Sequence, residues 1–246
     1  MISHRLQAKE TFRTHAKTFS LAARFLNKER HDSVARLYAF CRYIDDLADT
    51  GAPGSNSEVL QSIRNDIEAG ASGDSYISDL LLLQKMHRIP TEILLDFVNA
   101  IIEDQYPREL QSVDELVRFA YGVASTVGLM MCYVFNVRNP KAFPFAIDLG
   151  VAMQMSNISR DILEDAERNR IYIPAELLPT PVTCEGLTQG DQTMRDSAYE
   201  GARQILQIAD TYYASAAMGY GYLPRSVRHT IKIAARLYQG IGEKIL

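Results

Sequence analysis

The sequence predicts an all-α protein, and three observations lead to this prediction. Apolar residues recur at helical spacing along most of the chain, as in Ile93, Leu94, Phe97, Val98 and Ile101. The alternating Val, Ile and Thr runs between tight turns that indicate strands are scarce. Apolar residues make up 47% of the 246 residues. This is enough to fill a large core, so extensive disorder is excluded.

Start and stop signals order the expected elements. Thr91 after Pro90 marks a helix start, and Ser112 with Glu115 forms a capping-box pattern before another helix. The last quarter of the chain is predicted to be two helices broken near "GYGYLP". Gly, Pro, Ser and Asn mark the expected loops, at residues 50–57, 69–75, 137–144 and 179–193. None of these loops is long enough to link domains, so we expect one domain over residues 1–246.

Residues 119–137 form a run of 19 residues without a charge, close to the length that spans a bilayer. The run contains Tyr, Ser, Thr and Asn, and nothing else in the sequence resembles a membrane span. We therefore expect a helix buried on all sides in a soluble protein. The polar amino terminus does not resemble a secretory signal.

Charge and cysteine content restrict the compartment and the partners. With 26 Lys and Arg against 30 Asp and Glu, the net charge is -4, which argues against general attraction to nucleic acid or to an anionic membrane. The three cysteines, Cys41, Cys132 and Cys184, have no metal-ligand spacing. We expect buried, reduced thiols and a cytoplasmic protein.

Two stretches place carboxylates among apolar residues. In "CRYIDDLADT", Asp45 and Asp49 lie four residues apart and so share one helix face. In "QMSNISRDILEDAERNR", Asn157, Asp161 and Asp165 share a face in the same way, with a glutamine one turn earlier. Each stretch alone has an ordinary interpretation, a solvated helix face for the first and a salt-bridged helix end for the second. Together they indicate a binding site.

Facing carboxylates repel one another unless a cation compensates them. All these side chains are oxygen ligands, and no cluster of His or Cys is present, so Mg²⁺ is favoured over Zn²⁺. Mg²⁺ usually completes its shell with water and substrate phosphates. The sequence therefore favours a diphosphate substrate bound through magnesium.

Several motifs carry a family resemblance. Along the chain these are "HAKTFSLAARFL", "YAFCRYIDDLAD", "FAYGVASTVGLMMCYVF", "MQMSNISRDILEDAERNRIYIPAELL" and "AARLYQGI", in the same order as the motifs of the head-to-head prenyl synthases. The chain resembles this squalene and phytoene synthase family over about residues 11 to 245, and its motif sequences are most similar to those of bacterial phytoene synthases. Ser159 and the end of the chain at Leu246 depart from the usual pattern.

The resemblance implies an isoprenoid synthase fold, a helical bundle around a central apolar cavity. It also implies a Mg²⁺-dependent prenyltransferase, with Mn²⁺ as a substitute and no expected use of NADPH. The implied reaction joins two geranylgeranyl diphosphates through a cyclopropyl diphosphate to phytoene, the first step of carotenoid biosynthesis. Alternatives are a squalene or dehydrosqualene synthase that uses farnesyl diphosphate, and a non-catalytic relative that acts as a binding or assembly protein. Head-to-tail elongators and terpene cyclases also use paired aspartates, but lack these motif contexts.

The resemblance assigns residues to three roles. The implied metal ligands are Asp45, Asp49, Asn157, Asp161 and Asp165. The implied catalytic residues are the four aspartates together with Tyr121 and Tyr238. The implied substrate-binding residues are His15, Ser20, Arg42, Gln154, Asn157, Arg160, Arg170 and Tyr172.

Some of these residues have simpler explanations. Arg42 could form an ion pair with Asp46, His15 could lie on a helix surface, and the tyrosines could be ordinary buried residues. The proposed apolar wall could be plain core packing, and its members are Phe119, Val127, Leu129, Met130 and Met131. The expected partner is a prenyl diphosphate, with transient contact to a membrane surface because substrate and product are greasy. Oligomeric state is left open.

Overall fold

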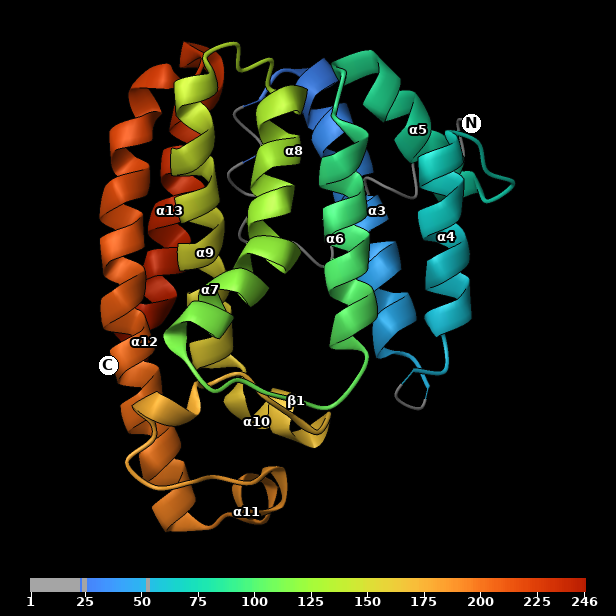
Figure 1. The fold of residues 1–246 in the computed structure, drawn as a ribbon. Helices are drawn as coiled ribbons and strands as arrows, with labels where there is room; N and C mark the ends of the chain where they lie inside the picture. Colours follow the sequence, from blue (N-terminus) through green and yellow to red (C-terminus); the bar gives the residue numbers. More distant parts are fainter. Residues whose placement is uncertain (1–22, 24–25, 52–53) are drawn as a thin grey trace.

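The computed structural model describes residue 23 and residues 26–51 and 54–246 (Figure 1). His15 and Ser20 lie outside these residues. The long helices run roughly along one direction, and those described are α3 (Lys28–Asp49), α4 (Ser57–Ala69), α5 (Ser75–His87), α6 (Thr91–Asp104), α7 (Val113–Ala120), α8 (Thr126–Val134), α9 (Phe143–Arg160), α10 (Ile162–Glu167), α11 (Cys184–Gln189), α12 (Gln192–Met218) and α13 (Arg225–Ile245). Short turns of helix join them at η1 (Tyr121–Ser125), η2 (Pro140–Ala142), η3 (Ala175–Leu177) and η4 (Gly219–Tyr222).

Strand structure is minimal in the described part of the chain. Two strands of two residues each, β1 (Arg108–Glu109) and β2 (Arg170–Ile171), pair in parallel. The all-α prediction is confirmed.

The predicted helix starts are largely correct. Pro90 is the N-cap of α6, which begins at Thr91. Ser112 caps α7 by accepting a hydrogen bond from the Glu115 backbone N–H at 3.3 Å. The Glu115 carboxylate, however, accepts from the Gln111 N–H at 2.7 Å rather than from Ser112. The capping box is therefore closed one residue earlier than the pattern predicts.

The uncharged run is divided between the end of α7, the π-helical turn η1 and α8. The segment Val113–Val134 is long and apolar enough to cross a membrane, and 56% of its most apolar window is buried inside the protein. It packs against α6 and α9 in the middle of the bundle. Burial on all sides was expected, but one face of this segment borders a cavity, described below.

Two other sequence predictions need correction. The expected loop at residues 179–193 contains α11, because Thr183 caps the Gly186 N–H and Gly190, at φ 87°, ends the helix. The expected loop at 137–144 contains η2 and the first residues of α9. Cys41 and Cys132 are buried as expected, whereas Cys184, in the first turn of α11, is only partly buried.

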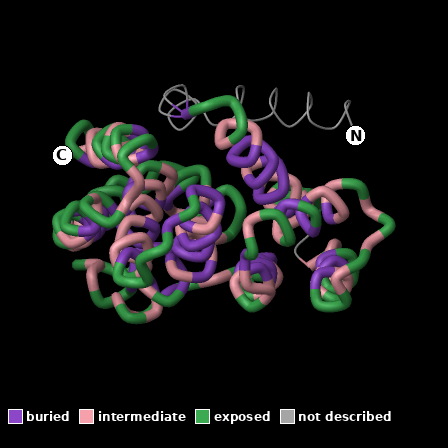
Figure 2. The backbone as a smooth tube through the Cα atoms, turned by 90° about the horizontal axis from the view of Figure 1, so that it is seen from above, coloured by how far each residue is buried: buried purple, intermediate pink, exposed green. Residues whose placement is uncertain are grey.

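The core consists of two apolar clusters. One lies among α3, α4, α5, α6 and α8, and the other among α7, α9, α10, α11 and α12. Figure 2, a view down the bundle, shows buried segments on the inward faces of the helices. The two halves meet where α9 crosses η1: a Cβ on Gly150 would lie 2.5 Å from the Ser125 Cα, so only glycine permits this approach. The contact fixes α9 against the central helices and brings the ends of α3, α6 and α9 to the same end of the bundle (Figure 1).

Candidate active site

The first acidic motif forms the last two turns of α3. Asp45 is partly buried, and Asp46 points outward and pairs with Arg42 at 2.5 Å. The ion pair considered for Arg42 is therefore present. Burial, and then repulsion from Asp49, raises the pKa of Asp45 to about 7. The inner face of this motif holds more negative charge than its surroundings balance.

The second motif crosses the junction of α9 and α10. Asp161 leaves helical geometry, at φ -102° and ψ 16°, yet its N–H donates to the Asn157 carbonyl at 2.9 Å and its carbonyl accepts from the Asp165 N–H at 2.8 Å. Backbone hydrogen bonds thus link Asn157 to Asp161 and Asp161 to Asp165, as they would in a continuous helix. Arg160 binds the Asp161 carboxylate through two nitrogens at 2.6 and 2.5 Å. Burial, followed by repulsion from Asp161, raises the pKa of Asp165 to about 7.

A third carboxylate, Asp104 at the end of α6, joins the two motifs. Arg170 on β2 lies 3.1 Å from Asp49 and 3.7 Å from Asp104, and so bridges α3 and α6. The Tyr172 hydroxyl donates to both Asp104 oxygens, at 2.8 Å each. Burial raises the pKa of Asp104 to about 6 although Arg170 and Tyr172 act against that rise.

The sequence interpretation missed Asp104. Its only signal was a charged residue at the end of the apolar stripe of α6, and such residues are common at helix ends. Electrostatic coupling of Asp104 with Asp45 on one side and with Asp165 on the other indicates one connected acidic cluster.

The five implied metal ligands are not gathered into a coordination sphere. Among the described residues, no group of three or more His, Cys, Asp or Glu side chains is close enough to hold a metal ion. Arginines instead compensate the carboxylates: Asp49 contacts Arg168 at 3.4 Å as well as Arg170, and Asp161 contacts Arg160. The donor set, carboxylate and amide oxygens with excess negative charge, nevertheless fits Mg²⁺.

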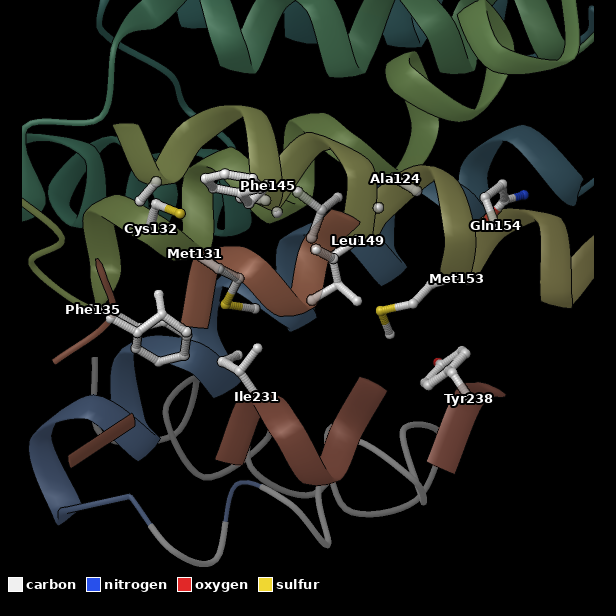
Figure 3. Close-up of a pocket in the computed structure, with 18 of the residues that line it drawn as sticks. Ala124, Met131, Cys132, Phe135, Phe145, Leu149, Met153, Gln154, Ile231 and Tyr238 are labelled. Atoms are coloured by element: carbon white, nitrogen blue, oxygen red, sulfur yellow. The ribbon is translucent and has the colours of Figure 1, made fainter. Parts of the chain in front are cut away.

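Figure 3 shows an apolar cavity of about 310 Å³. It lies beside the acidic cluster, since its lining residues Tyr38 and Tyr238 interact electrostatically with Asp45 and Asp161. Gln154 and Asn157, one turn before Asp161, line one end, and the Asn157 amide donates to the Gln154 side-chain oxygen at 3.3 Å. The remaining lining is mostly apolar, and Phe135 and Cys132 lie at the opposite end of the view from Gln154.

One face of α9 and η2 runs the full length of the cavity. The lining residues on it recur every three or four positions, and they are Ala142, Phe145, Ala146, Leu149, Gly150, Met153, Gln154 and Asn157. From Ala142 to Asn157 is 15 residues (157 minus 142), which corresponds to about 22 Å at the rise of an α-helix. The cavity is thus a long slot with the side-chain amides of Gln154 and Asn157 at one end.

The tyrosines considered for the site differ in whether they border the cavity. Tyr238 of α13 lines the cavity, and its pKa is raised by burial, while Arg160 acts against that rise. Tyr38, one turn before Arg42, also lines the cavity, and the sequence interpretation missed it. Tyr121 does not border the cavity, and its hydroxyl lies 3.4 Å from an Asp96 carboxylate oxygen. The cavity therefore brings together Tyr238 and Tyr38 rather than Tyr238 and Tyr121.

The predicted apolar wall is correct in part. Val127 and Met131 line the cavity. Leu129, Met130 and Phe119 are core residues instead, and Phe119 stacks on Tyr172 with ring centroids 4.6 Å apart. A period of 3.6 distinguishes faces, but in an uncharged run every face is apolar, so sequence could not tell which one borders the cavity.

Comparison with known proteins follows this geometry. The sequence profile described as squalene/phytoene synthase matches residues 12–246. The chain belongs to the squalene/phytoene synthase family. A 15-cis-phytoene synthase of Paracoccus sp. (strain N81106 / MBIC 01143) is 30% identical over 251 residues, covering 98% of this chain and 81% of the relative. A phytoene synthase of Rhodobacter capsulatus is 33% identical over 249 residues, covering 96% and 71%.

Two solved structures share the fold of this chain. A dehydrosqualene synthase in complex with a ligand superimposes with a TM-score of 0.79 at 24% identity, covering 96% of this chain and 83% of that chain. The squalene synthase HpnC from Alicyclobacillus acidocaldarius gives 0.81 at 20% identity, covering 98% and 92%. The isoprenoid synthase fold and membership of a prenyltransferase enzyme family are therefore confirmed.

Proposed function

We propose that this protein is a phytoene synthase, which joins two molecules of geranylgeranyl diphosphate head to head. The observation that carries the proposal is the continuity of an acidic cluster with a long apolar slot, since a prenyl diphosphate has the same division into a charged head and a greasy tail. Relatives named phytoene synthase at about 30% identity support the same reaction.

The length of the slot supports the choice of donor. An extended prenyl chain advances about 1.25 Å per bond, given carbon–carbon bonds of about 1.5 Å. The 16-carbon main chain of a geranylgeranyl group then measures about 20 Å, and the 12-carbon main chain of farnesyl about 15 Å. The lining face from Asn157 to Ala142, about 22 Å long, accommodates the longer chain. A farnesyl tail would end near Ala146 and leave the last turn empty.

The carboxylates and arginines would exchange partners when substrate binds. Asp45, Asp49, Asn157, Asp161 and Asp165 would hold Mg²⁺, with Mn²⁺ as a substitute. When bound, the metal supplies positive charge to the leaving diphosphate. Arg160, now paired with Asp161, and Arg170, now paired with Asp49, would turn to the phosphate oxygens, and Arg42 would leave the outward-facing Asp46 to do the same. Because each of these arginines already contacts a carboxylate of one of the two motifs, the exchange would require only side-chain movement.

The proposed chemistry proceeds by two ionisations. In the first, the allylic C–O bond of one donor breaks and diphosphate leaves with the electron pair. The double bond of the second donor attacks the resulting cation, and proton loss closes a cyclopropylcarbinyl diphosphate. In the second, this diphosphate leaves, the ring rearranges, and loss of another proton gives phytoene. The protein's task is to bind the heads, align the tails and exclude water.

The cavity lining suits these cations. Met131, Leu149 and Met153 give apolar walls that exclude water, which protects a carbocation from hydrolysis. Tyr238 and Tyr38 place aromatic rings at the polar end, where a cation would form. The pKa of both hydroxyls is raised, to about 12 for Tyr38, chiefly by burial, so both stay protonated at neutral pH.

A farnesyl-using enzyme is the second candidate, since the two structural neighbours described above are a dehydrosqualene synthase and a squalene synthase. The test is to incubate purified protein with Mg²⁺ and each donor, with and without NADPH, and to identify the hydrocarbon by mass spectrometry. Phytoene from geranylgeranyl diphosphate without NADPH is the expected result. Formation of squalene or dehydrosqualene from farnesyl diphosphate would identify farnesyl diphosphate as the donor instead. If neither donor gave a hydrocarbon, the result would favour a binding or assembly role.

A further inference from the structure

The end of the bundle opposite the acidic cluster carries an unusual distribution of charge. Residues 133–147 and 211–242 contain no Asp or Glu, although the whole chain has a net charge of -4. These two segments meet at this end, where η2 contacts η4 and Phe145 stacks on Tyr222 at 5.8 Å between ring centroids. They contain six Lys or Arg residues, of which the five before Arg236 are here called the basic end: Arg138, Lys141, Arg225, Arg228 and Lys232.

The cations of the basic end are available to an external anion. Arg138, Lys141, Arg225 and Lys232 are exposed. Within the described part of the chain, none of the five belongs to an ion pair, whereas Arg236, further along α13, is paired with Glu243. Lys232 lies 5.4 Å from the centroid of the Tyr220 ring, and Arg228 donates to two backbone carbonyls. The adjacent start of α3 contributes two cations and two acids, so it does not neutralise this charge.

Apolar side chains are interspersed with these cations. Met218 is 67% exposed, the largest exposed fraction among the large apolar residues of the described chain, and Tyr222 is 37% exposed. Behind them, Leu223 and Phe145 belong to the apolar end of the cavity. In Figure 1 the ends of α8 and α12 and the starts of α9 and α13 gather here, and Figure 2 looks down on this end. Tyrosines and apolar tips among lysines and arginines are typical of surfaces that rest on a bilayer.

We propose that the basic end is a docking surface for an anionic lipid bilayer. Local charge decides this interaction rather than net charge, because charges further than about 10 Å from the surface are largely screened at 0.1 M salt. The acidic cluster lies at the far end of the bundle, more than one such length away, so it would not oppose docking of the basic end. Nucleic acid also attracts cations, but a phosphate backbone gives no apolar partner to the exposed Met218 and Tyr222, whereas the bilayer does.

The experiment is vesicle sedimentation of the full chain, without substrate, so that its result is independent of the proposed reaction. The vesicles contain either phosphatidylcholine alone or phosphatidylcholine mixed with phosphatidylglycerol. The test variant is Lys141→Glu with Arg225→Glu. The matched control is Arg118→Glu with Lys244→Glu, two exposed cations away from the basic end that make the same change in net charge. Circular dichroism and thermal melts verify that both variants fold.

The wild-type protein is expected to bind the anionic vesicles and to be released by 0.5 M salt. The test variant should lose affinity at least about tenfold, since each basic residue near an anionic surface contributes a several-fold factor, and the control should stay within about twofold. Met218→Ser should weaken binding without changing its salt dependence. Equal losses in test and control variants, equal binding to neutral vesicles, or binding to duplex DNA but not to vesicles would overturn the proposal.

Discussion

The two ends of the cavity differ in how they treat charge. At the polar end, Asp45, Asp104 and Asp165 have raised pKa values because burial and mutual repulsion outweigh the arginines around them. At the apolar end, the cavity is lined by Phe135, Phe145 and Leu223, and the surface outside carries the cations of the basic end. The fold keeps its uncompensated negative charge at one end of the slot. Under the proposed function, a ligand that is cationic through bound metal at its head and apolar along its tail would be oriented by this difference before any chemistry occurs.

Removing charge from the polar end should have the largest effect. Asp161→Asn is expected to lower kcat by at least about 10³-fold, because the carboxylate stabilises charge where the diphosphate leaves. Single-turnover hydrocarbon formation would measure this. Asp46→Asn is the control, since Asp46 is exposed and pairs outward with Arg42, and it should cost no more than a few-fold. Equal losses in the two variants would remove the distinction between the inner and outer carboxylates.

Shortening the slot should change the donor. Ala146→Leu adds bulk at about 16 Å from Asn157, eleven residues along α9, where a farnesyl tail would end. We expect kcat/KM for geranylgeranyl diphosphate to fall about tenfold or more, with that for farnesyl diphosphate nearly unchanged or raised, since overpacking costs about 1–3 kcal/mol.

Competition between the two donors in one reaction would give this ratio directly. Ala214→Leu, on the exposed side of α12, is the control and should keep the wild-type ratio. A fall in rate with both donors to the same degree would mean that the length of the slot does not select the tail.

The pH dependence of stability should report the excess charge at the polar end. A carboxyl group whose pKa is raised on folding binds more protons in the folded state, so it opposes folding once it ionises. For Asp104, at about 6, and Asp45 and Asp165, at about 7, this penalty is absent below about pH 4, the unfolded value, and complete above about pH 7.

The melting temperature of the metal-free protein should therefore fall by a few degrees between pH 5 and pH 7.5. Asp45→Asn should make this decline shallower, whereas Asp46→Asn, which removes only a lesser repulsion on Asp45, should change it much less. Scanning calorimetry across this range would measure the melting temperature of each protein. Titration of histidines such as His87 affects all three proteins equally, so it cancels in the difference between variants. A decline that is identical in all three proteins would assign the pH dependence to other groups.

The sequence predicted most of the fold because helix signals are local. Thr91 and Ser112 begin helices where their patterns place them, and the break near "GYGYLP" separates α12 from α13. Local signals failed where two structures share one composition: a loop rich in Gly, Thr and Pro also contains the caps that form α11, and the loop at 137–144 contains η2 and the start of α9.

The site was less accessible to sequence because it depends on contacts between distant elements. The spacing predicted that Asp161 and Asp165 share one helix face, and the backbone hydrogen bonds across the α9–α10 junction agree with this prediction. Nothing local marks Asp104 as the partner of Arg170, 66 residues away, or selects Tyr38 over Tyr121 for the cavity. These facts follow from how α3, α6 and α9 pack, and the roles given to the motif residues stay predictions until they are measured.

The central claim is that carboxylates from both motifs hold the same metal-bound diphosphate. Its most direct test is a titration of Mn²⁺ in the presence of inorganic diphosphate, followed by electron paramagnetic resonance, on wild-type protein, Asp45→Asn, Asp161→Asn and the Asp46→Asn control. We predict that wild type and control bind Mn²⁺ only together with diphosphate, and that either inner variant alone weakens this joint binding at least about tenfold. Binding that is unchanged in one of the two inner variants would contradict a site shared by both motifs.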